Sequence, residues 1–313
     1  MYNFNHLYYF YITAKSGGVT AASKHLRLSQ PSLSSQLKVL ESALNQRLFQ
    51  KVGRKNELTE TGAIIYGLCR QMFEVSEELK ELVSKRIPSA SRWIHIGVSD
   101  EVERSFVVEV VSLFLKKYTL AQRPKVSINS GTHEQLIERL RFRELDAIFT
   151  PVVMTDPEIE NMECAEVPVV LICPNKWKIS SNTEKLKAPA AIKKIIGGEN
   201  AQWLMPSSRF KLRAQIDLFF EENDLEGRIV FESDIMASIA RAAGDNVGMA
   251  FLPFIYAARE IQKKSVQILG PKEGYWKYRV WLSCNKQNKN DKLLNLLSLS
   301  FKEIYNKANS LKL

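Results

Sequence analysis

The stretch "VTAASKHLRLSQPSLSSQLKVLE", residues 19–41, decides the fold of the N-terminal part of the chain. Ala22 is small enough to let a second helix approach closely, and Leu26 follows it by one helical turn. After a short polar turn, Ser29 is a good helix N-cap, and Pro31 is tolerated in the first turn of the next helix. The stretch therefore predicts two short helices joined by a tight turn, which is a helix-turn-helix.

The second of these helices has two different faces. Leu33, Leu37 and Leu40 follow one another at i, i+4 and i+7 and predict its buried side. The free side carries short polar groups and one cation, at Gln30, Pro31, Ser32, Ser34, Ser35 and Lys38. Gln can bond to adenine, Ser to bases or phosphate, and Lys to the backbone, so this face suits a DNA major groove. A three-helix bundle with a solvated polar face is an alternative that gives the same Leu spacing.

A small basic hairpin, or wing, is predicted next to this helix. In "RLFQKVGRKNELT", residues 47–59, an apolar pair precedes a turn at Gly53, and three cations flank that turn. These cations are Lys51, Arg54 and Lys55. Residues 1–58 hold 8 Lys and Arg against 2 Asp and Glu, a net charge of +6, whereas residues 59–90 hold 4 against 5, a net charge of −1. Because phosphate contacts need clustered cations, the wing favours a nucleic-acid role.

A long helix is expected from Thr59 to a break at Pro88. Apolar residues recur in it at alternating steps of three and four, at Ile65, Leu68, Met72, Val75, Leu79 and Leu82. This spacing predicts a coiled-coil seam that pairs two chains, which would present two helix-turn-helix units to a two-part site. A helix that packs on its own domain is the alternative.

The remainder of the chain alternates short apolar strands with helices, which predicts an α/β fold with parallel strands. Strands are expected at residues 93–99, 125–131, 146–150, 202–208, 227–233, 246–253, 265–271 and 278–286, before a terminal helix around 293–305. We predict two similar lobes. The expected domains are residues 1–58 for DNA binding, 59–88 for the linker helix, 92–164 with 268–313 for lobe 1, and 165–267 for lobe 2.

The composition narrows the class of protein. The chain has 313 residues and a formal net charge of +10, which favours a polyanionic partner. Its four cysteines form no Cys-x-x-Cys pair, so neither a zinc site nor a disulfide framework is expected. The N-terminus does not read as a signal peptide, and the apolar run Val167 to Cys173 is too short to span a bilayer. We expect a cytoplasmic protein with no membrane partner, no metal and no cofactor.

A ligand cleft is predicted beyond the carboxyl ends of the strands, where helix N-termini offer free backbone N–H groups. The residues at these ends are Ser99, Asp100, Ser130, Thr132, His133, Thr150, Ser207, Arg209, Asp234 and Phe251. If the effector is a small carboxylate, Ser99, Thr132, Ser207 and Arg209 are its expected contacts. If the signal is a monovalent cation or pH, the candidates are Asp100, Glu232 and Asp234 as oxygen ligands and His133 as a titrating group. Ser, Thr and Asp are also ordinary helix caps at such places.

The stretches "AASKHLRLSQPSLSSQLKVLE" and "LFQKVGRKNELTETG" closely resemble the DNA-binding domain of LysR-type transcriptional regulators. The resemblance implies a winged helix-turn-helix, a dimerising linker helix and a two-lobed sensor similar to periplasmic binding proteins. It also implies double-stranded DNA, RNA polymerase and a small effector as partners, with assembly as dimers and commonly tetramers. The chain departs from the family at Lys51, where Arg is frequent, and at Ser35, where a basic residue is frequent.

Four further stretches, "NHLYYFYITAKSGGVTAA", "GVSDEV", "THEQLIERL" and "FLPFIYA", look most like the subgroup that activates sodium/proton antiporter genes. This likeness implies a sodium- or pH-responsive activator.

Two other functions are weighed against a regulator. An enzyme has little support, because the sequence shows no Gly-rich phosphate loop, no metal-spaced ligand group and no Gly-x-Ser-x-Gly elbow. A solute-binding module whose N-terminal domain contacts only proteins is the second alternative. The basic wing argues against it.

Overall fold

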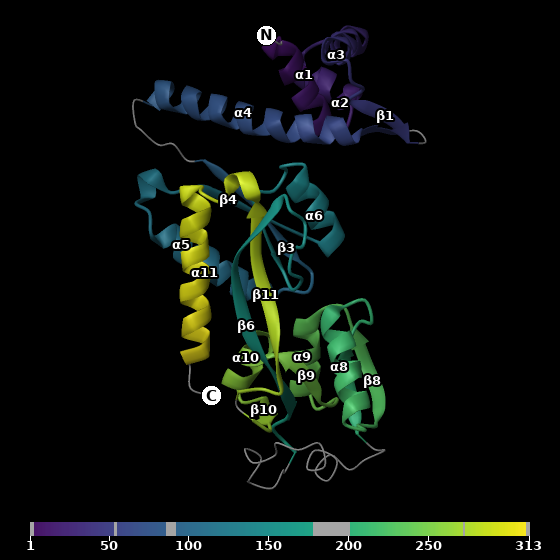
Figure 1. Ribbon diagram of the computed structural model, residues 1–313, viewed down its shortest axis with the longest axis vertical. Coiled ribbons are helices and arrows are strands. Elements are labelled where there is room, and N and C mark those ends of the chain that lie inside the picture. The colour runs from purple at the N-terminus through teal and green to yellow at the C-terminus, as the bar shows by residue number, and fades with distance from the viewer. Residues whose placement is uncertain (1–2, 53–54, 86–91, 178–200, 272, 311–313) are drawn as a thin grey trace. The chain divides into compact units, whose positions relative to one another are not determined.

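The computed structural model describes residues 3–52, 55–85, 92–177, 201–271 and 273–310 (Figure 1). It divides into two compact units. Unit 1 comprises Met1–Gly97, Leu115–Asn129 and Glu134–Ala147, and unit 2 comprises Val98–Phe114, Ser130–His133 and Ile148–Leu313. Arg54 and Pro88, which the sequence analysis singled out, lie outside the described residues.

Unit 1 begins with three helices and a hairpin. These are α1 (Phe4–Lys15), α2 (Val19–Leu26), α3 (Gln30–Leu44), β1 (Phe49–Val52) and β2 (Lys55–Leu58). Phe10, Ala22, Leu33 and Leu40 are fully buried between the helices, as the spacing of the apolar residues requires. The winged helix-turn-helix predicted from the sequence is therefore confirmed.

Helix α4 (Glu60–Lys85) starts close against the hairpin. The Thr59 hydroxyl donates to the Arg47 carbonyl at 2.6 Å and accepts from the Gly62 amide at 2.9 Å. A Cβ at Gly62 would overlap the carbonyl oxygen of Leu48, so only glycine allows this approach. Further along, Phe73 lies with its ring centroid 5.4 Å from that of Tyr11 on α1. One face of α4 thus packs on the helix-turn-helix of its own chain.

The rest of unit 1 belongs to the edge of a larger sheet. Strands β3 (Trp93–Ser99) and β4 (Lys125–Gly131) are neighbours in it, and β4 is its end strand. Helix α6 (His133–Arg141) follows β4, and its apolar side buries Leu136 and Leu140. The carboxyl ends of β3 and β4, where the sequence analysis placed part of the ligand cleft, belong to unit 2.

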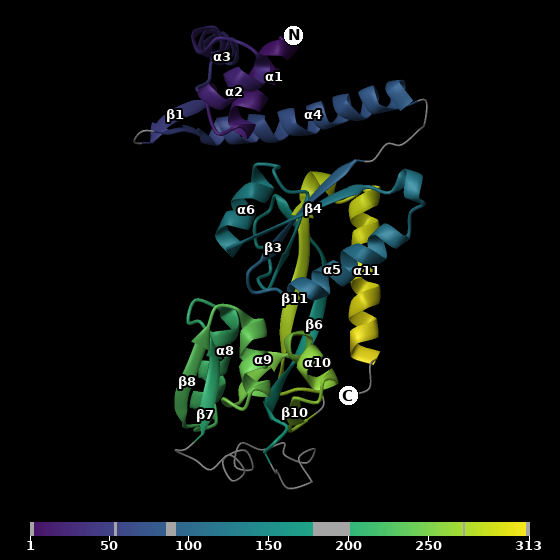
Figure 2. The ribbon, with the colours of Figure 1, turned by 180° about the vertical axis from the view of Figure 1, so that it is seen from behind.

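Unit 2 is built around a long strand that the sequence analysis did not predict. Strand β6 (Ile159–Pro174) has 16 residues and pairs antiparallel with β11 (Trp276–Asn285), as Figures 1 and 2 show. It also pairs antiparallel with β9 (Ala250–Pro253) and β10 (Val266–Leu269). The apolar run at its C-terminal end is buried, and α9 (Met236–Gly244), α10 (Phe254–Gln262) and α11 (Lys292–Ser310) all pack against β6.

The expected parallel pairing occurs elsewhere in unit 2, between β7 (Gln202–Pro206) and β8 (Arg228–Ser233). The remaining elements are α5 (Arg104–Lys116), the short helix η1 (Leu120–Gln122), β5 (Ala147–Thr150), α8 (Lys211–Glu222) and the short helix η4 (Lys286–Asn288). The α/β fold class is confirmed. Among the described helices, none has the length and apolar character needed to cross a bilayer.

Candidate nucleic-acid interface and effector cleft

The start of α3 is built as the sequence predicts. Ser29 is the N-cap, and its hydroxyl accepts a hydrogen bond from the Ser32 amide at 3.2 Å. Leu33 and Leu37 are buried below. The opposite side of the helix is open: Gln30, Pro31, Ser32, Ser35 and Lys38 are exposed and Ser34 is half-buried. This row of hydroxyl, amide and ammonium groups can donate to and accept from base edges or phosphates.

The wing is an antiparallel hairpin that pairs Val52 with Lys55 and Lys51 with Asn56. Lys51 is exposed. The backbone of Lys55 lies in β2, while Arg54 stays a prediction because it falls in the turn outside the described residues.

A carboxylate that sequence analysis missed ties the wing to the recognition helix. Oε1 of Glu41 on α3 accepts hydrogen bonds from the amides of Leu48 at 2.7 Å and Phe49 at 3.3 Å. A hollow of about 710 Å³ between helix and wing is lined by, among others, Ser34, Lys38, Arg47 and Lys51. Arg47 was also missed, although it is an exposed cation just before the wing. The hollow therefore gathers three cations beside the point where Glu41 joins α3 to the start of the wing.

Helix α4 leaves an apolar stripe uncovered. Ile64, Leu68, Val75 and Leu79 are 41%, 44%, 63% and 61% exposed. Their intervals of four, seven and four residues place them on one side of the helix. Of the predicted seam, Ile65 and Met72 are half-buried, and the side chain of Leu82 lies outside the described residues. The stripe is distinct from the face that packs on the helix-turn-helix.

A hollow of about 320 Å³ in unit 2 brings together three of the predicted cleft residues, Asp100, Arg209 and Asp234. Arg209 pairs with Asp234 at 3.2 Å, and Asp100 pairs with Arg104 at 3.6 Å. Val102, Glu103, Arg104, Ile235, Met236, Ala237 and Tyr256 complete the lining. The hollow therefore has two ion pairs and a third carboxylate, Glu103, and the rest of its wall is mostly apolar.

The other predicted cleft residues do not line this hollow. Ser99 is buried, and its hydroxyl accepts from the Glu101 amide at 3.3 Å. Thr150 is buried too, with its Oγ1 2.9 Å from Nδ1 of His133. The amide of Ser207, which is half-buried, donates to the Ser233 carbonyl. Ser130 is exposed and Thr132 is half-buried, both at the entrance to α6.

Phe251 belongs to the hydrophobic core and not to an open cleft. Its ring stacks on Trp203 with centroids 5.8 Å apart, and the rings of Phe219 and Tyr275 lie edge-on to it at 5.3 Å and 5.2 Å. The residue is almost completely buried. All four residues of β9 are buried, so the side chain of Phe251 is not exposed to a ligand in this structure.

Glu101, next to Asp100, is a buried carboxylate that the sequence analysis passed over. Its Oε2 accepts a hydrogen bond from the Lys211 amide at the start of α8 at 2.7 Å. Its backbone carbonyl accepts from the hydroxyls of Tyr256 at 2.8 Å and Tyr278 at 3.2 Å. Burial raises the pKa of Glu101, although the bonds from the start of α8 oppose the shift. Only the three-dimensional structure shows this role, because its partners lie more than 100 residues away.

The carboxylates proposed for a cation each already have an arginine partner. Beside the pairs of Asp100 and Asp234, Glu232 pairs with Arg213 at 3.0 Å. In the part of the chain that the structure describes, no group of three or more His, Cys, Asp or Glu side chains could hold a metal ion. A ligand of either charge would therefore meet groups that are already paired.

Comparison with known families and proteins agrees with this architecture. Residues 4–63 match the family described as bacterial regulatory helix-turn-helix protein, lysR family, and residues 89–303 match the LysR substrate binding domain. The transcriptional activator protein NhaR of Escherichia coli strain K12 is 28% identical over 86% of this chain and 85% of its own length. The transcriptional activator CmpR of Synechocystis is 23% identical over 79% of this chain and 77% of its own.

Solved structures show the same fold. A full-length OxyR variant from Pseudomonas aeruginosa has a TM-score of 0.68 at 16% identity and covers 96% of this chain and 95% of its own. LysG from Corynebacterium glutamicum with bound effector Arg has a TM-score of 0.61 at 14% identity, over 98% and 99%. The two family matches together span most of the chain, and the relatives are transcription regulators and not enzymes. The chain therefore belongs to the LysR family of DNA-binding transcriptional regulators, with a C-terminal effector-binding domain.

Proposed function

We propose that α3 reads base edges in the major groove of double-stranded DNA while the wing and Arg47 hold the phosphates. The exposed Gln, Ser and Lys face of α3, anchored by Leu33 and Leu37, is the observation that carries this proposal. The net charge of +6 over residues 1–58 supplies the electrostatic attraction. Binding to a natural two-part site, compared with a scrambled site of equal length at the same salt concentration, tests it.

Two copies of the chain pair through α4 in this proposal. The exposed stripe of Ile64, Leu68, Val75 and Leu79 supports it, because a second α4 buries such a stripe and places two recognition helices on one DNA molecule. A second type of contact would join dimers into tetramers. Exposed apolar residues on two sheet edges support that step, namely Ile128 on β4, and Ile229 and Val230 on β8. The domain boundaries predicted from the sequence, and contact with RNA polymerase in the cytoplasm, are part of the same proposal.

The effector in this proposal is a small molecule with a carboxylate, held in the hollow beside Arg104 and Arg209. Each arginine faces a single exposed or half-exposed acid, so a ligand carboxylate can compete for its guanidinium. The cavity volume of about 320 Å³ suits a small metabolite. Thermal unfolding of the full-length chain with a panel of small carboxylates, repeated with Arg209→Ala, tests the site.

A sodium or pH signal is the second candidate. The similarity to NhaR over most of both chains supports it, and so does the buried Glu101, whose raised pKa makes its charge sensitive to pH. Under this candidate the chain activates antiporter genes. Titration of the same thermal unfolding with sodium chloride against potassium chloride, at several pH values, separates it from the carboxylate.

A further inference from the structure

Helix α4 has a third face, which is polar and buried. Arg70 and Asp146 have side chains only 7% and 5% exposed, and Nη2 of Arg70 lies 3.7 Å from Oδ1 of Asp146. The same Nη2 donates a hydrogen bond to the Arg143 carbonyl at 2.6 Å. Nη1 bonds to both carboxylate oxygens of Glu74, one turn along the helix, at 3.2 Å and 3.3 Å. The guanidinium thus connects the linker helix with the segment between α6 and β5.

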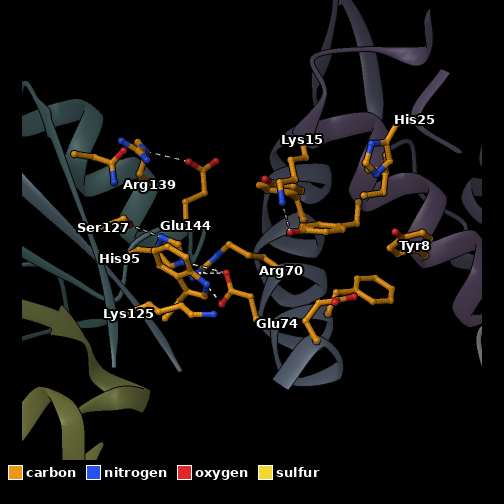
Figure 3. Close-up of a pocket in the computed structure, with 17 residues that line it drawn as sticks. Tyr8, Lys15, His25, Arg70, Glu74, His95, Lys125, Ser127, Arg139 and Glu144 are labelled. Carbon is orange, nitrogen blue, oxygen red and sulfur yellow. Dashed lines mark hydrogen bonds and ion pairs between the residues drawn. The ribbon is translucent and has the colours of Figure 1, made fainter. Parts of the chain in front are cut away.

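Glu74 makes the second connection, to strand β3. Its Oε1 lies 3.0 Å from Nε2 of His95, whose Nδ1 lies 2.7 Å from the Ser127 hydroxyl. Burial alone raises the pKa of Glu74, but the hydrogen bonds from His95 and Arg70 outweigh it and hold that pKa below its usual range. Figure 3 shows Arg70 and Glu74 directed from α4 toward His95. The backbone amide of His95 in turn donates to Oδ2 of Asp146 at 2.7 Å, so the two connections share one network.

The backbones approach closely at the same place. A Cβ at Gly67 would overlap the carbonyl oxygen of Phe142 and would lie 3.0 Å from Cβ of Arg143. Glycine at this position therefore lets α4 lie directly against the end of α6. Tyr8, Lys15 and His25 line the far side of the adjoining cavity of about 620 Å³, as Figure 3 shows. The close polar contact to the sheet edge comes from α4.

We propose that Arg70, Glu74, His95 and Asp146 form a clamp that fixes the effector-domain edge to the linker helix of the same chain. A buried ion pair is a weak source of stability, but it specifies one arrangement, because removing one partner leaves an uncompensated charge. Arg70 suits this role, since its planar group donates to the Glu74 carboxylate and the Arg143 carbonyl at once and also lies within ion-pair distance of Asp146. Through the clamp, a conformational change in the effector-binding domain would rotate the linker helix and the helix-turn-helix attached to it. That consequence rests on the proposed function, whereas the clamp itself does not.

Hydrogen exchange on the full-length chain without DNA tests the clamp. Arg70→Met should speed amide exchange about tenfold or more in residues 142–146 and in the middle of α4, because both sides lose their partner. Arg241→Met is the matched control, since it removes an exposed ion pair with Asp245 at 3.0 Å and should leave these segments unchanged. Exchange within twofold of wild type in Arg70→Met overturns the clamp.

Two further variants cover a failure of Arg70→Met to fold. The double variant Arg70→Met/Asp146→Asn removes both charges, so it should fold and still show fast exchange in both segments. Gly67→Ala leaves the charges in place and should separate the same two segments by steric overlap. Slow, wild-type exchange in a folded double variant also overturns the proposal.

A DNase I footprint on the same variants separates the clamp from the proposed function. If the clamp passes a signal between the effector domain and the DNA-binding domain, its loss in Arg70→Met should change the span or spacing of protection on a two-part site. The affinity of the variant for a half-site should stay within about threefold of wild type. Faster exchange with an unchanged footprint overturns the regulatory role of the clamp. Faster exchange in the variant, together with no sequence-specific footprint by wild type, supports the clamp and overturns the proposed DNA function.

Discussion

Thr20 on α2 donates a hydrogen bond from its hydroxyl to Oε1 of Gln30, the first residue of α3, over 3.2 Å. The bond joins the two helices of the helix-turn-helix at the end of α3 that bears the exposed polar face. It also orients the Gln30 amide before DNA is bound, which lowers the cost of fixing a flexible side chain on a base. Gln30 is therefore held by a side-chain bond to α2 at the exposed face of α3.

Gln30→Ala should weaken binding to the specific site by about 1–3 kcal/mol and leave binding to a scrambled site nearly unchanged. Thr20→Val should have a smaller effect in the same direction, because it removes only the orienting bond. Gln46→Ala, at an exposed position after α3, is the matched control. Fluorescence anisotropy on both DNAs measures the difference. Equal losses on specific and scrambled DNA would show that Gln30 contacts only the backbone.

The wing should contribute affinity without sequence preference. Lys51→Ala is expected to lower the slope of log K against log salt by about 1, and alanine at Lys51, Arg54 and Lys55 together by about 3, because each phosphate contact releases counterions. Titrations at four salt concentrations measure this slope. A triple variant that keeps the wild-type slope would contradict a phosphate-binding wing.

The exposed stripe on α4 predicts the oligomeric state. Val75→Glu with Leu79→Glu should convert dimers to monomers and weaken binding to a two-part site, while binding to a single half-site persists. Leu299→Glu, at a position of similar exposure on α11, should leave the dimer intact. Sedimentation velocity reports the change. Dimers that survive the double substitution place the pairing surface elsewhere.

The effector hollow makes a prediction about signalling. Arg104→Ala and Arg209→Ala should each abolish the response to a small carboxylate, because each removes a guanidinium that would bind it, while DNA affinity stays within about twofold. Asp245→Ala removes an exposed acid outside the hollow and serves as the control. A normal response in Arg104→Ala and Arg209→Ala would refute this placement of the effector.

Glu101 predicts a dependence of stability on pH. Burial raises the pKa of Glu101, so the folded chain takes up its proton at a higher pH than the unfolded chain. Its contribution to stability is therefore present below the ordinary pKa of a glutamic acid and is lost as pH rises through the raised value. Relative to Glu101→Gln, wild type should lose stability in urea unfolding as pH rises above the ordinary pKa of a glutamic acid. A difference in stability between wild type and Glu101→Gln that does not change with pH would contradict this assignment.

Sequence reasoning was most successful where structure depends on neighbours along the chain. The spacing of Leu33 and Leu37 and the cap at Ser29 predicted the recognition helix, because helical periodicity and capping are local. Strand β6 escaped prediction because half of it, Ile159 to Glu166, is mixed in polarity and is a strand only through pairing with β11. Phe251 was predicted to line the cleft but lies in the core. The short apolar run around it would look the same in the sequence in either place.

The tertiary contacts of the candidate sites were the least predictable part. Glu101 bonds to a helix more than 100 residues away, and Arg70 reaches a carbonyl 73 positions further on. Neither residue has a spacing or motif that marks it in the sequence. Both side chains are buried, where a charged group interacts more strongly with its hydrogen-bond partners than it would at the surface.

A DNase I footprint at near-physiological salt, on the DNA that flanks this chain's own gene, tests the central claim most directly. A dimeric or larger LysR-type regulator should protect a two-part site over several helical turns, and the protected span should change with the effector, with sodium or with pH. Protection of a single short site, or protection that disappears equally on any sequence as salt rises, would contradict a sequence-specific multimeric regulator.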